Sequence, residues 1–284
     1  MTTTAMTTPT DPTTGPAAYA DVVDLDRYPI HDLDSDASHG LVEECRAQLV
    51  AQGACALEGF IRPGAVAEMA RLALSLEEVA WSSNQSHTVY FTEPDASQGA
   101  DHPLARTVRS AKHGIAYDHI PAEAPVRRLY ESDDLTRFIA AVLEKPVLHR
   151  SADPLDAMQM TLFHEGDELG WHFDNSEFSV TVMYQPANAG GDFLYAPGLR
   201  SQDDENYAGV QRVLDGADTD RLRVLPSAPG TLAFFRGQHA LHWVTPIQGP
   251  TPRINTVLTY GERPDMRLSD LTSQLFYGRT SPRD

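Results

Sequence analysis

The sequence predicts an α+β fold in which a layer of helices supports an antiparallel double sheet. Apolar residues recur at helical spacing in the first half of the chain, between residues 38 and 143. From Met158 onward, short β-branched and aromatic runs are separated by Gly, Pro, Asp or Asn. A length of 284 residues, 41% of them hydrophobic and 22% charged, provides enough material for a buried core. Helices followed by strands are typical of an α+β domain.

The N-terminal segment and the composition indicate a cytoplasmic protein without a nucleic-acid or membrane partner. Residues 1–20 are rich in Thr, Pro and Ala and are predicted to be disordered, and they lack the basic and apolar regions of a signal peptide. No apolar run approaches the ~20 residues of a membrane span. The formal charge of −18 would repel nucleic acids and anionic membranes. Cys45 and Cys55 are expected to be buried thiols in a reducing compartment.

Residues 21–157 are predicted to form a helical and lid region that packs on the core. Residues 38–52 carry one apolar stripe, and Gly53 supplies a C-terminal stop. A short buried strand follows in ACALEGF, and Pro63 opens a second helix. A third helix is expected over residues 134–143. Between them, residues 81–120 are rich in His, Ser, Thr and Asp, which predicts an irregular loop over a site.

Residues 158–263 are predicted to form an all-β sandwich or barrel, which would be the catalytic core. Seven strand-like runs lie within it, namely MQMTLF, FSVTVMYQ, GDFLYAP, RLRVLP, GTLAFFRG, ALHWVTP and INTVLTYG. The polar insert over residues 197–222 is expected to be a long loop. Residues 264–284 remain as a C-terminal extension.

The stretch GWHFDNSEF contains two good metal ligands. His172 and Asp174 are two residues apart in a strand-like run, so their side chains are expected to project from the same face. One imidazole and one carboxylate suit a divalent iron centre, and a second histidine would complete a facial triad. His242 is the better candidate because it lies inside the run LHWVTP, whereas His239 follows the turn-like RGQ. We therefore predict a metal site formed by His172, Asp174 and His242.

A buried cation is expected near this site. Arg253 begins another strand-like run, eleven residues after His242. A guanidinium group makes a two-pronged contact with a carboxylate. Arg253 could therefore hold the far end of an acidic cosubstrate.

Along the chain an HxD motif is followed by a Gly-rich turn in YQPANAGGDFLY, and then by His242 and Arg253. A chain with these pieces in this order resembles the iron(II)- and 2-oxoglutarate-dependent oxygenases. The resemblance implies a double-stranded β-helix core of the jelly-roll or cupin type. It also implies Fe(II), 2-oxoglutarate and O2 as metal and cosubstrates. In that family the triad holds iron, and the arginine at the position of Arg253 binds the distal carboxylate of 2-oxoglutarate.

Residues 40–265 further resemble the branch of this superfamily that acts on free amino acids and includes the lysine-type radical halogenases. The similarity is carried by RRLYESDDLTRFIAAVLEKPVL and HRSADPLDAMQMTLFHEGDELGWHFD. In the halogenases a glycine replaces the metal-binding carboxylate, so that a halide can bind the iron. Asp174 is retained here, and the resemblance therefore implies oxygenation of a C–H bond, in natural-product tailoring, by hydroxylation, desaturation or ring closure.

The resemblance places Arg109 where this branch uses an arginine for the substrate carboxylate, and Arg106 could exchange roles with it. Asn175, Thr259 and Asn255 are expected to face the substrate. The lysine-type enzymes carry an acid and a histidine where this chain has Asn175 and Leu169, which argues against a cationic substrate tail. Asp153, Asp156 or Glu177 could still supply an anion. The expected substrate is a free, linear amino acid whose tail is neutral or modified.

Two other readings remain open at this stage. A hydroxylase of peptidyl-prolyl residues would share the barrel and the order of the motif, but it would need an open groove. A non-catalytic double-sheet binding protein with a structural or vestigial metal site would also share the fold. The oligomeric state is not indicated by the sequence.

Overall fold

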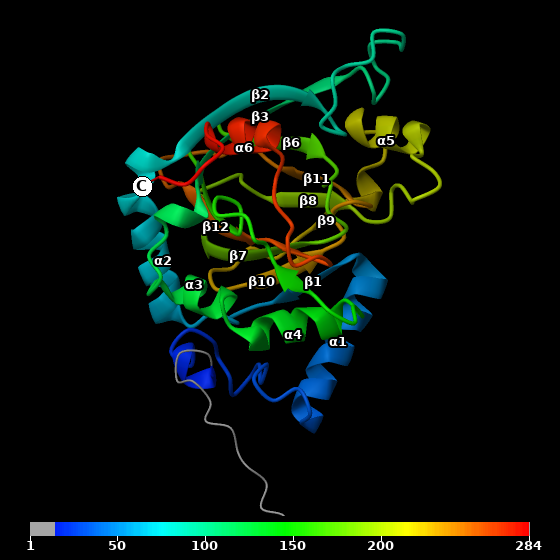
Figure 1. The fold of residues 1–284 in the computed structure, drawn as a ribbon. Coiled ribbons are helices and arrows are strands. Elements are labelled where there is room, and N and C mark those ends of the chain that lie inside the picture. Colours follow the sequence, from blue (N-terminus) through cyan, green and yellow to red (C-terminus); the bar gives the residue numbers. More distant parts are fainter. Residues whose placement is uncertain (1–14, 284) are drawn as a thin grey trace, which may run out of the picture.

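The computed structural model describes residues 15–283, and its main antiparallel sheet of eleven strands curls into two facing halves, here called the larger and the smaller sheet (Figure 1). The larger sheet contains, in spatial order, β1 (Ala54–Leu57), β10 (Leu232–Phe235), β7 (Ser179–Gln185), β12 (Arg253–Leu258) and β5 (Met158–Phe163). The smaller sheet contains β6 (Glu168–His172), β11 (Leu241–Val244), β8 (Phe193–Ala196) and β9 (Arg223–Val224). Successive strands from β5 to β12 largely alternate between the two sheets, which confirms the predicted double-stranded β-helix.

Strand β3 (Thr107–Ile115) joins the two sheets along one side. Its first half pairs with β6 and its second half pairs with β5. Strand β2 (Trp81–Thr88) pairs along its whole length with the other edge of β3. A separate two-stranded ribbon pairs β4 (His149–Arg150) with β13 (Tyr260–Gly261).

Side chains of the larger sheet alternate between an apolar outer face and a more polar inner face. On β5, Met158, Met160 and Leu162 belong to the main hydrophobic core, whereas Gln159 and Thr161 line a cavity between the sheets. The same alternation holds for β7, β10 and β12. A period of two is what a strand with two different environments requires. Most polar residues within β5, β7 and β12 therefore lie on the inner face.

Four helices cover the outer face of the larger sheet, as the sequence predicts for a supporting layer (Figure 1). They are α1 (Asp36–Gln52), α2 (Pro63–Ser75), α3 (Pro125–Tyr130) and α4 (Asp133–Val142). The Ser35 side chain caps the start of α1, and Gly53 ends it with a left-handed φ of 74°. Pro63 is in the first turn of α2, as expected. The sequence analysis did not predict the short helix α3.

The last residues of the predicted disordered tail are folded. Residues 1–14 of the predicted disordered segment lie outside the described residues. The remainder forms a short 3-10 helix, Pro16–Ala18, and the fully buried Tyr19 donates a hydrogen bond of 2.5 Å to Asp134 Oδ2 on α4. The apolar ring of Tyr19 anchors this segment to the helical layer.

The expectation of an irregular loop over residues 81–120 is wrong. Strands β2 and β3 form a hairpin with eight paired positions, and only residues 89–106 between them are irregular apart from turns. The sequence WSSNQSHT has little intrinsic strand preference. Pairing with β3, which is itself anchored to β5 and β6, decides its conformation. A short 3-10 helix, Glu77–Val79, precedes β2, and another, Tyr117–His119, follows β3.

Two other segments contain helices that were not predicted. The insert over residues 197–222, expected as a loop, contains α5 (Tyr207–Leu214) and a 3-10 helix, Thr219–Arg221. The C-terminal extension contains α6 (Asp270–Tyr277), which lies beside the β2–β3 hairpin (Figure 1). Both are short, and each is held by side chains buried against the sheets.

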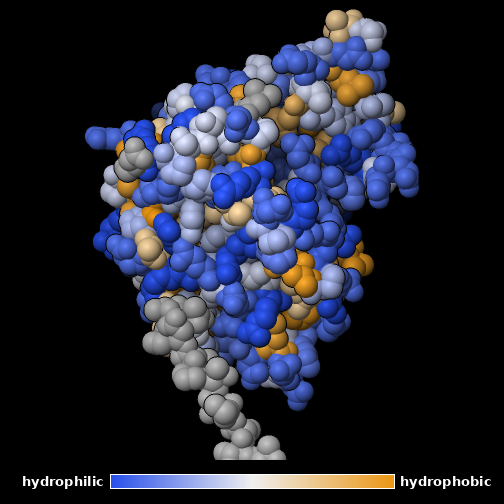
Figure 2. Space-filling view, in the orientation of Figure 1, coloured by the Kyte–Doolittle hydropathy of each residue, from blue (hydrophilic) through white to orange (hydrophobic). Residues whose placement is uncertain are grey.

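The surface seen in Figure 2 is predominantly hydrophilic, with apolar side chains in small scattered groups. This agrees with the high net charge of the chain, −18. Among the described residues, no helix is both long and apolar enough to cross a membrane. Cys45 and Cys55 are free and buried, as predicted.

Candidate metal centre and its cavity

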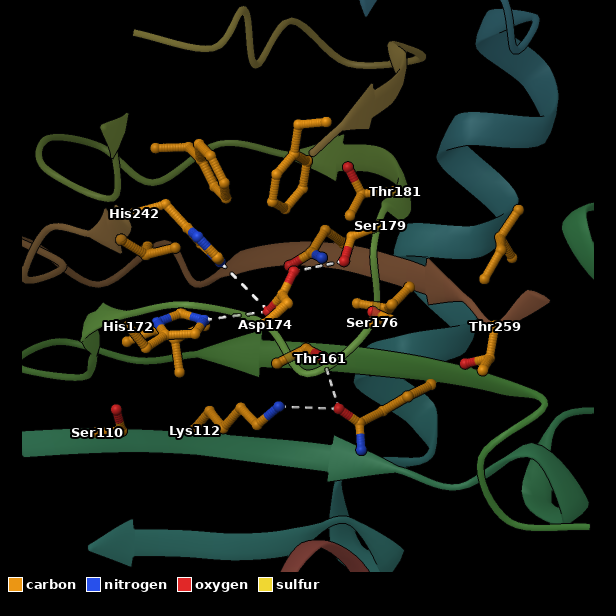
Figure 3. A pocket seen from close by; sticks show the side chains of 18 of the residues that line it. Ser110, Lys112, Thr161, His172, Asp174, Ser176, Ser179, Thr181, His242 and Thr259 are labelled. Carbon is orange, nitrogen blue, oxygen red and sulfur yellow. Dashed lines mark hydrogen bonds and ion pairs between the residues drawn. The ribbon is translucent and has the colours of Figure 1, made fainter. Parts of the chain in front are cut away.

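The three predicted metal ligands converge at one end of the space between the sheets (Figure 3). Asp174 Oδ1 lies 3.5 Å from His172 Nε2 and 3.4 Å from His242 Nε2. His172 ends β6, and His242 lies directly opposite it on β11. Both histidines are buried. Asp174 was expected to lie in the same strand as His172, but it lies two residues beyond the end of β6.

Hydrogen bonds fix both imidazole rings in the form that can bind a metal. The Nδ1 atom of His172 lies 2.7 Å from the carbonyl oxygen of Gly170, and that of His242 lies 2.8 Å from the carbonyl of Ala240. Because a carbonyl oxygen only accepts, Nδ1 carries the proton in each ring. The Nε2 atoms face Asp174 and are the ring nitrogens placed to bind a metal.

The charges of the three ligands also suit a divalent cation. Burial, and then the neighbouring His242, lowers the pKa of His172 to about 4, so this ring is neutral at physiological pH. Burial alone would raise the pKa of the Asp174 carboxyl, but His242 and His172 outweigh it and hold that pKa well below its usual range. Two imidazoles and one carboxylate fit iron(II).

The position of Asp174 is set by its surroundings. The hydroxyl of Ser179 on β7 donates a hydrogen bond of 2.5 Å to Asp174 Oδ2. The backbone N–H of Asp174 bonds to the carbonyl of Gly237 at 3.1 Å. A Cβ atom on Gly237 would lie 2.0 Å from Asp174 Oδ2, so only glycine leaves room for the carboxylate. The turn RGQ before β11 therefore shapes the metal site.

The β2–β3 hairpin supports His172 through a directed chain of hydrogen bonds. His87 Nδ1 faces the carbonyl of Thr88 at 2.8 Å and must carry the proton, so its Nε2 accepts from the Ser110 hydroxyl at 2.7 Å. Ser110 Oγ accepts from the N–H of Gly170 at 3.0 Å, and the carbonyl of Gly170 accepts from His172. Such outer partners orient metal-binding histidines.

Arg253 lies on the inner face of β12, buried in the wall of the same space. The two hydrogen-bond partners that the structure gives its guanidinium are both neutral, the carbonyl of Gly191 at 3.1 Å and Asn255 Oδ1 at 2.6 Å. Burial lowers the pKa of Arg253 to about 10, which still leaves it charged at neutral pH. A buried cation with neutral partners is suited to binding an anion.

A cavity of about 380 Å³ contains both the triad and Arg253. Its walls come from the inner faces of the two sheets, from the β2–β3 hairpin and from α6. This volume falls within the range of small-molecule sites, roughly 300–1,000 Å³. Leu268, Thr272 and Phe276, in and just before α6, are also part of its lining.

Some of the predicted substrate residues line the cavity and others do not. Asn175, Thr259 and Asn255 line the cavity, as does Leu169. Asn175 is exposed, whereas Asn255 is buried beside Arg253.

Neither Arg109 nor Arg106 lines this cavity. The Arg109 guanidinium bonds to Asn84 Oδ1 at 3.1 Å and to the carbonyl of Gly166 at 2.9 Å, and it does not line the cavity. Arg106 forms an ion pair of 2.6 Å with Asp215 near α5. Alternation along β3 explains the outcome, because Arg109 points to the opposite side from Ser110 and Lys112.

Of the three acids considered for a substrate amine, only Asp156 lines the cavity. Asp153 is buried and accepts the backbone N–H groups of Leu155 and Leu268. Glu177 is exposed and forms an ion pair of 2.6 Å with Lys145.

Lys112, His87 and Ser110 also line the cavity, and the sequence analysis missed all three. They lie on strands that were expected to be a loop. Ser110 and Lys112 are polar and two residues apart, so in a strand they share one face, and this spacing was the signal that could have revealed an inner face.

The fold, the His-Asp-His triad and the buried arginine fit an iron(II)- and 2-oxoglutarate-dependent oxygenase that uses O2. The Halogenase D family matches residues 39–275, which is most of the sequence. The chain therefore belongs to the Halogenase D family.

Solved structures with similar folds share little sequence with the chain. The epimerase SnoN from nogalamycin biosynthesis, described as non-heme and α-ketoglutarate-dependent, is 15% identical with a TM-score of 0.52 and covers 78% of this chain and 83% of its own. AviO1 from Streptomyces viridochromogenes Tue57 is 15% identical with a TM-score of 0.51 and covers 80% of this chain and 97% of its own.

A prolyl hydroxylase from Trichoplax adhaerens, in complex with a peptide fragment, is 14% identical with a TM-score of 0.51. It covers 78% of this chain and 89% of its own. At these identities the likeness concerns the fold. No curated protein matches the chain.

Proposed function

We propose that the protein oxidises an unactivated C–H bond of a free amino acid or an amino-acid derivative, in natural-product biosynthesis. The products are a hydroxylated, desaturated or cyclised amino acid, together with succinate and CO2. The observation that carries this proposal is the cavity of about 380 Å³, which is lined by the triad, by Arg253 and by several other polar side chains among apolar ones. Its volume suits a small cosubstrate and a small substrate better than a peptide.

His172, Asp174 and His242 would hold iron(II), and Arg253 would bind the distal carboxylate of 2-oxoglutarate. When bound, iron, 2-oxoglutarate and O2 supply the oxidant that breaks the C–H bond. Asn255 holds the guanidinium of Arg253 in place through a hydrogen bond of 2.6 Å. The chain's own contribution is to orient the cosubstrate and the substrate and to exclude water from the cavity.

Asp174 supports oxygenation over halogenation, although the family is named for halogenases. Its carboxylate occupies the third protein position of the triad, 3.5 Å or less from both Nε2 atoms. Ser179 and the space left by Gly237 hold it there. A filled carboxylate position leaves no place for a halide, so we infer that chloride has no part in the reaction.

The test measures succinate release from 2-oxoglutarate with Fe(II) and O2, with and without a panel of free amino acids, and identifies products by mass spectrometry. We expect succinate formation that is stimulated by at least one free amino acid. Stimulation by a prolyl peptide alone would favour a prolyl hydroxylase. The absence of any turnover would favour a non-catalytic binding protein.

A further inference from the structure

Lys112, on the inner face of β3, is a second cation in the cavity, and the cofactor scheme above leaves it without a role. Its ammonium group has three N–H donors. The hydrogen-bond partner that the structure gives it is the neutral oxygen Gln159 Oε1, at 3.0 Å (Figure 3). Burial lowers the pKa of Lys112, against the attraction of Asp156 and Asp174. The Lys112 ammonium is poorly solvated in this wall, and an anion would stabilise it. This position therefore suits an anionic group of a ligand.

Asp156, just before β5, places a carboxyl group in the same part of the cavity. The Tyr277 hydroxyl donates a hydrogen bond of 2.5 Å to its Oδ1, and the Thr259 hydroxyl lies 3.5 Å from its Oδ2. Burial raises the pKa of Asp156 to about 6. Lys112 and Asp156 influence each other electrostatically, yet each is hydrogen-bonded to other, uncharged groups. Each therefore keeps capacity for a charged ligand.

These observations deepen the proposed function and rest on it. We propose that Lys112 binds the carboxylate, and Asp156 the ammonium group, of the amino-acid head of the substrate. Opposite charges on neighbouring parts of one wall match a zwitterion, whose two charged groups are separated by a single carbon atom. The substrate side chain then extends along the cavity to the triad. The oxidised C–H bond accordingly lies on the side chain and not at the α-carbon.

Helix α6 completes this part of the cavity. Tyr277 holds Asp156 through its hydroxyl group, and Phe276 places its ring 5.6 Å from the Lys112 ammonium. Trp81 Nε1 on β2 donates to the carbonyl of Leu275 at 3.1 Å and ties the helix to the hairpin. The head-group site therefore combines the hairpin, the segment before β5 and the C-terminal helix.

Arg109 provides a matched control on the same strand. It lies three residues before Lys112, and its guanidinium bonds outside the cavity to Asn84 and Gly166. A general effect of removing a positive charge from β3 would appear in both Arg109→Met and Lys112→Met. A head-group site predicts an effect of Lys112→Met alone.

The experiment uses the full chain with Fe(II) and 2-oxoglutarate. For an amino acid that the wild-type protein oxidises, kcat/KM is compared with that of its carboxamide, which lacks the negative charge, and of its des-amino acid, which lacks the positive charge. Lys112→Met is expected to lower kcat/KM for the amino acid by roughly 30-fold or more, as for a lost buried charge contact, and to reduce its preference over the carboxamide. Asp156→Asn should lower the preference over the des-amino acid. Arg109→Met should change both ratios less than about twofold.

Ratios measured within one variant do not depend on how much of that variant is folded. Lys112→Arg keeps the charge and should retain the preference for the amino acid over the carboxamide. The assignment is overturned if Lys112→Met and Asp156→Asn keep the wild-type ratios, or if Arg109→Met loses them. It is overturned together with the amino-acid class if the wild-type protein releases succinate and oxidises no member of the panel. A wild-type protein that releases no succinate at all would contradict the oxygenase function itself.

Discussion

The two halves of the cavity are built from different parts of the molecule. The metal and cosubstrate half comes from the core strands β6, β11 and β12, which are paired on both sides within the two sheets. The substrate half comes from the β2–β3 hairpin, the segment before β5 and the helix α6. This difference suggests that the barrel sets the reaction type, whereas the added elements select the molecule on which it acts.

The largest expected effect comes from breaking the metal half. Asp174→Gly removes the carboxylate ligand and should lower oxygenation by at least about 100-fold, because even outer partners of a metal ligand are worth 10- to 100-fold. Mass spectrometry of the product measures the loss of oxygenation, and elemental analysis measures the bound iron. Asp203→Gly, at an exposed position in the insert, is the control and should stay within about twofold of wild type. Unchanged oxygenation by Asp174→Gly would show that the metal site is misassigned.

Removal of the cation assigned to 2-oxoglutarate, Arg253, should weaken the binding of 2-oxoglutarate selectively. Arg253→Met is expected to raise the KM for 2-oxoglutarate by roughly 30-fold or more, because truncating one side of a buried charge contact costs about 2–5 kcal/mol. The KM for the amino acid should change much less. Arg263→Met, at an exposed position, serves as the control. An equal rise in both KM values would argue against the assigned role of Arg253.

The hairpin links the two halves through His87 and Ser110. Ser110→Ala breaks the chain of hydrogen bonds that orients His172, and it should weaken metal binding by roughly 10-fold. Calorimetric titration with Co(II) or Fe(II) measures this without turnover. Ser82→Ala, on the exposed side of β2, should bind the metal like the wild type. Equal metal affinities of the wild type, Ser110→Ala and Ser82→Ala would show that the hairpin does not contribute to metal binding.

The smallest expected effect concerns the pH dependence of the substrate half. Burial raises the pKa of Asp156 to about 6, so this carboxyl takes up a proton as the pH falls through that value. A protonated carboxyl cannot pair with an ammonium group. The kcat/KM for the amino acid should therefore be about tenfold lower at pH 5 than at pH 8. In Asp156→Asn this inflection should disappear, and its persistence would assign the titration to another group.

The sequence was informative about the metal half because His172, His242 and Arg253 lie on strands with clear β patterns, and Asp174 follows two residues after one of them. His172, Asp174, His242 and Arg253 could be placed from spacing and from the resemblance to a known family. The substrate half was not accessible in the same way. WSSNQSHT becomes a strand only through pairing with β3, and α6 is held by tertiary contacts, so neither was visible in local preferences. Once β3 was missed, the inward Lys112 could not be distinguished from the outward Arg109.

The oxygenase assignment is tested most directly by the fate of molecular oxygen. The protein, Fe(II), 2-oxoglutarate and a responsive amino acid are incubated under isotopically labelled O2, and succinate and the amino acid are analysed by mass spectrometry. The account predicts one labelled oxygen atom in succinate for each amino acid oxidised. It also predicts either a second labelled atom in a hydroxylated product or the loss of two hydrogen atoms from a desaturated or cyclised product. Unlabelled succinate, or a chlorinated amino acid when chloride is present, would contradict it.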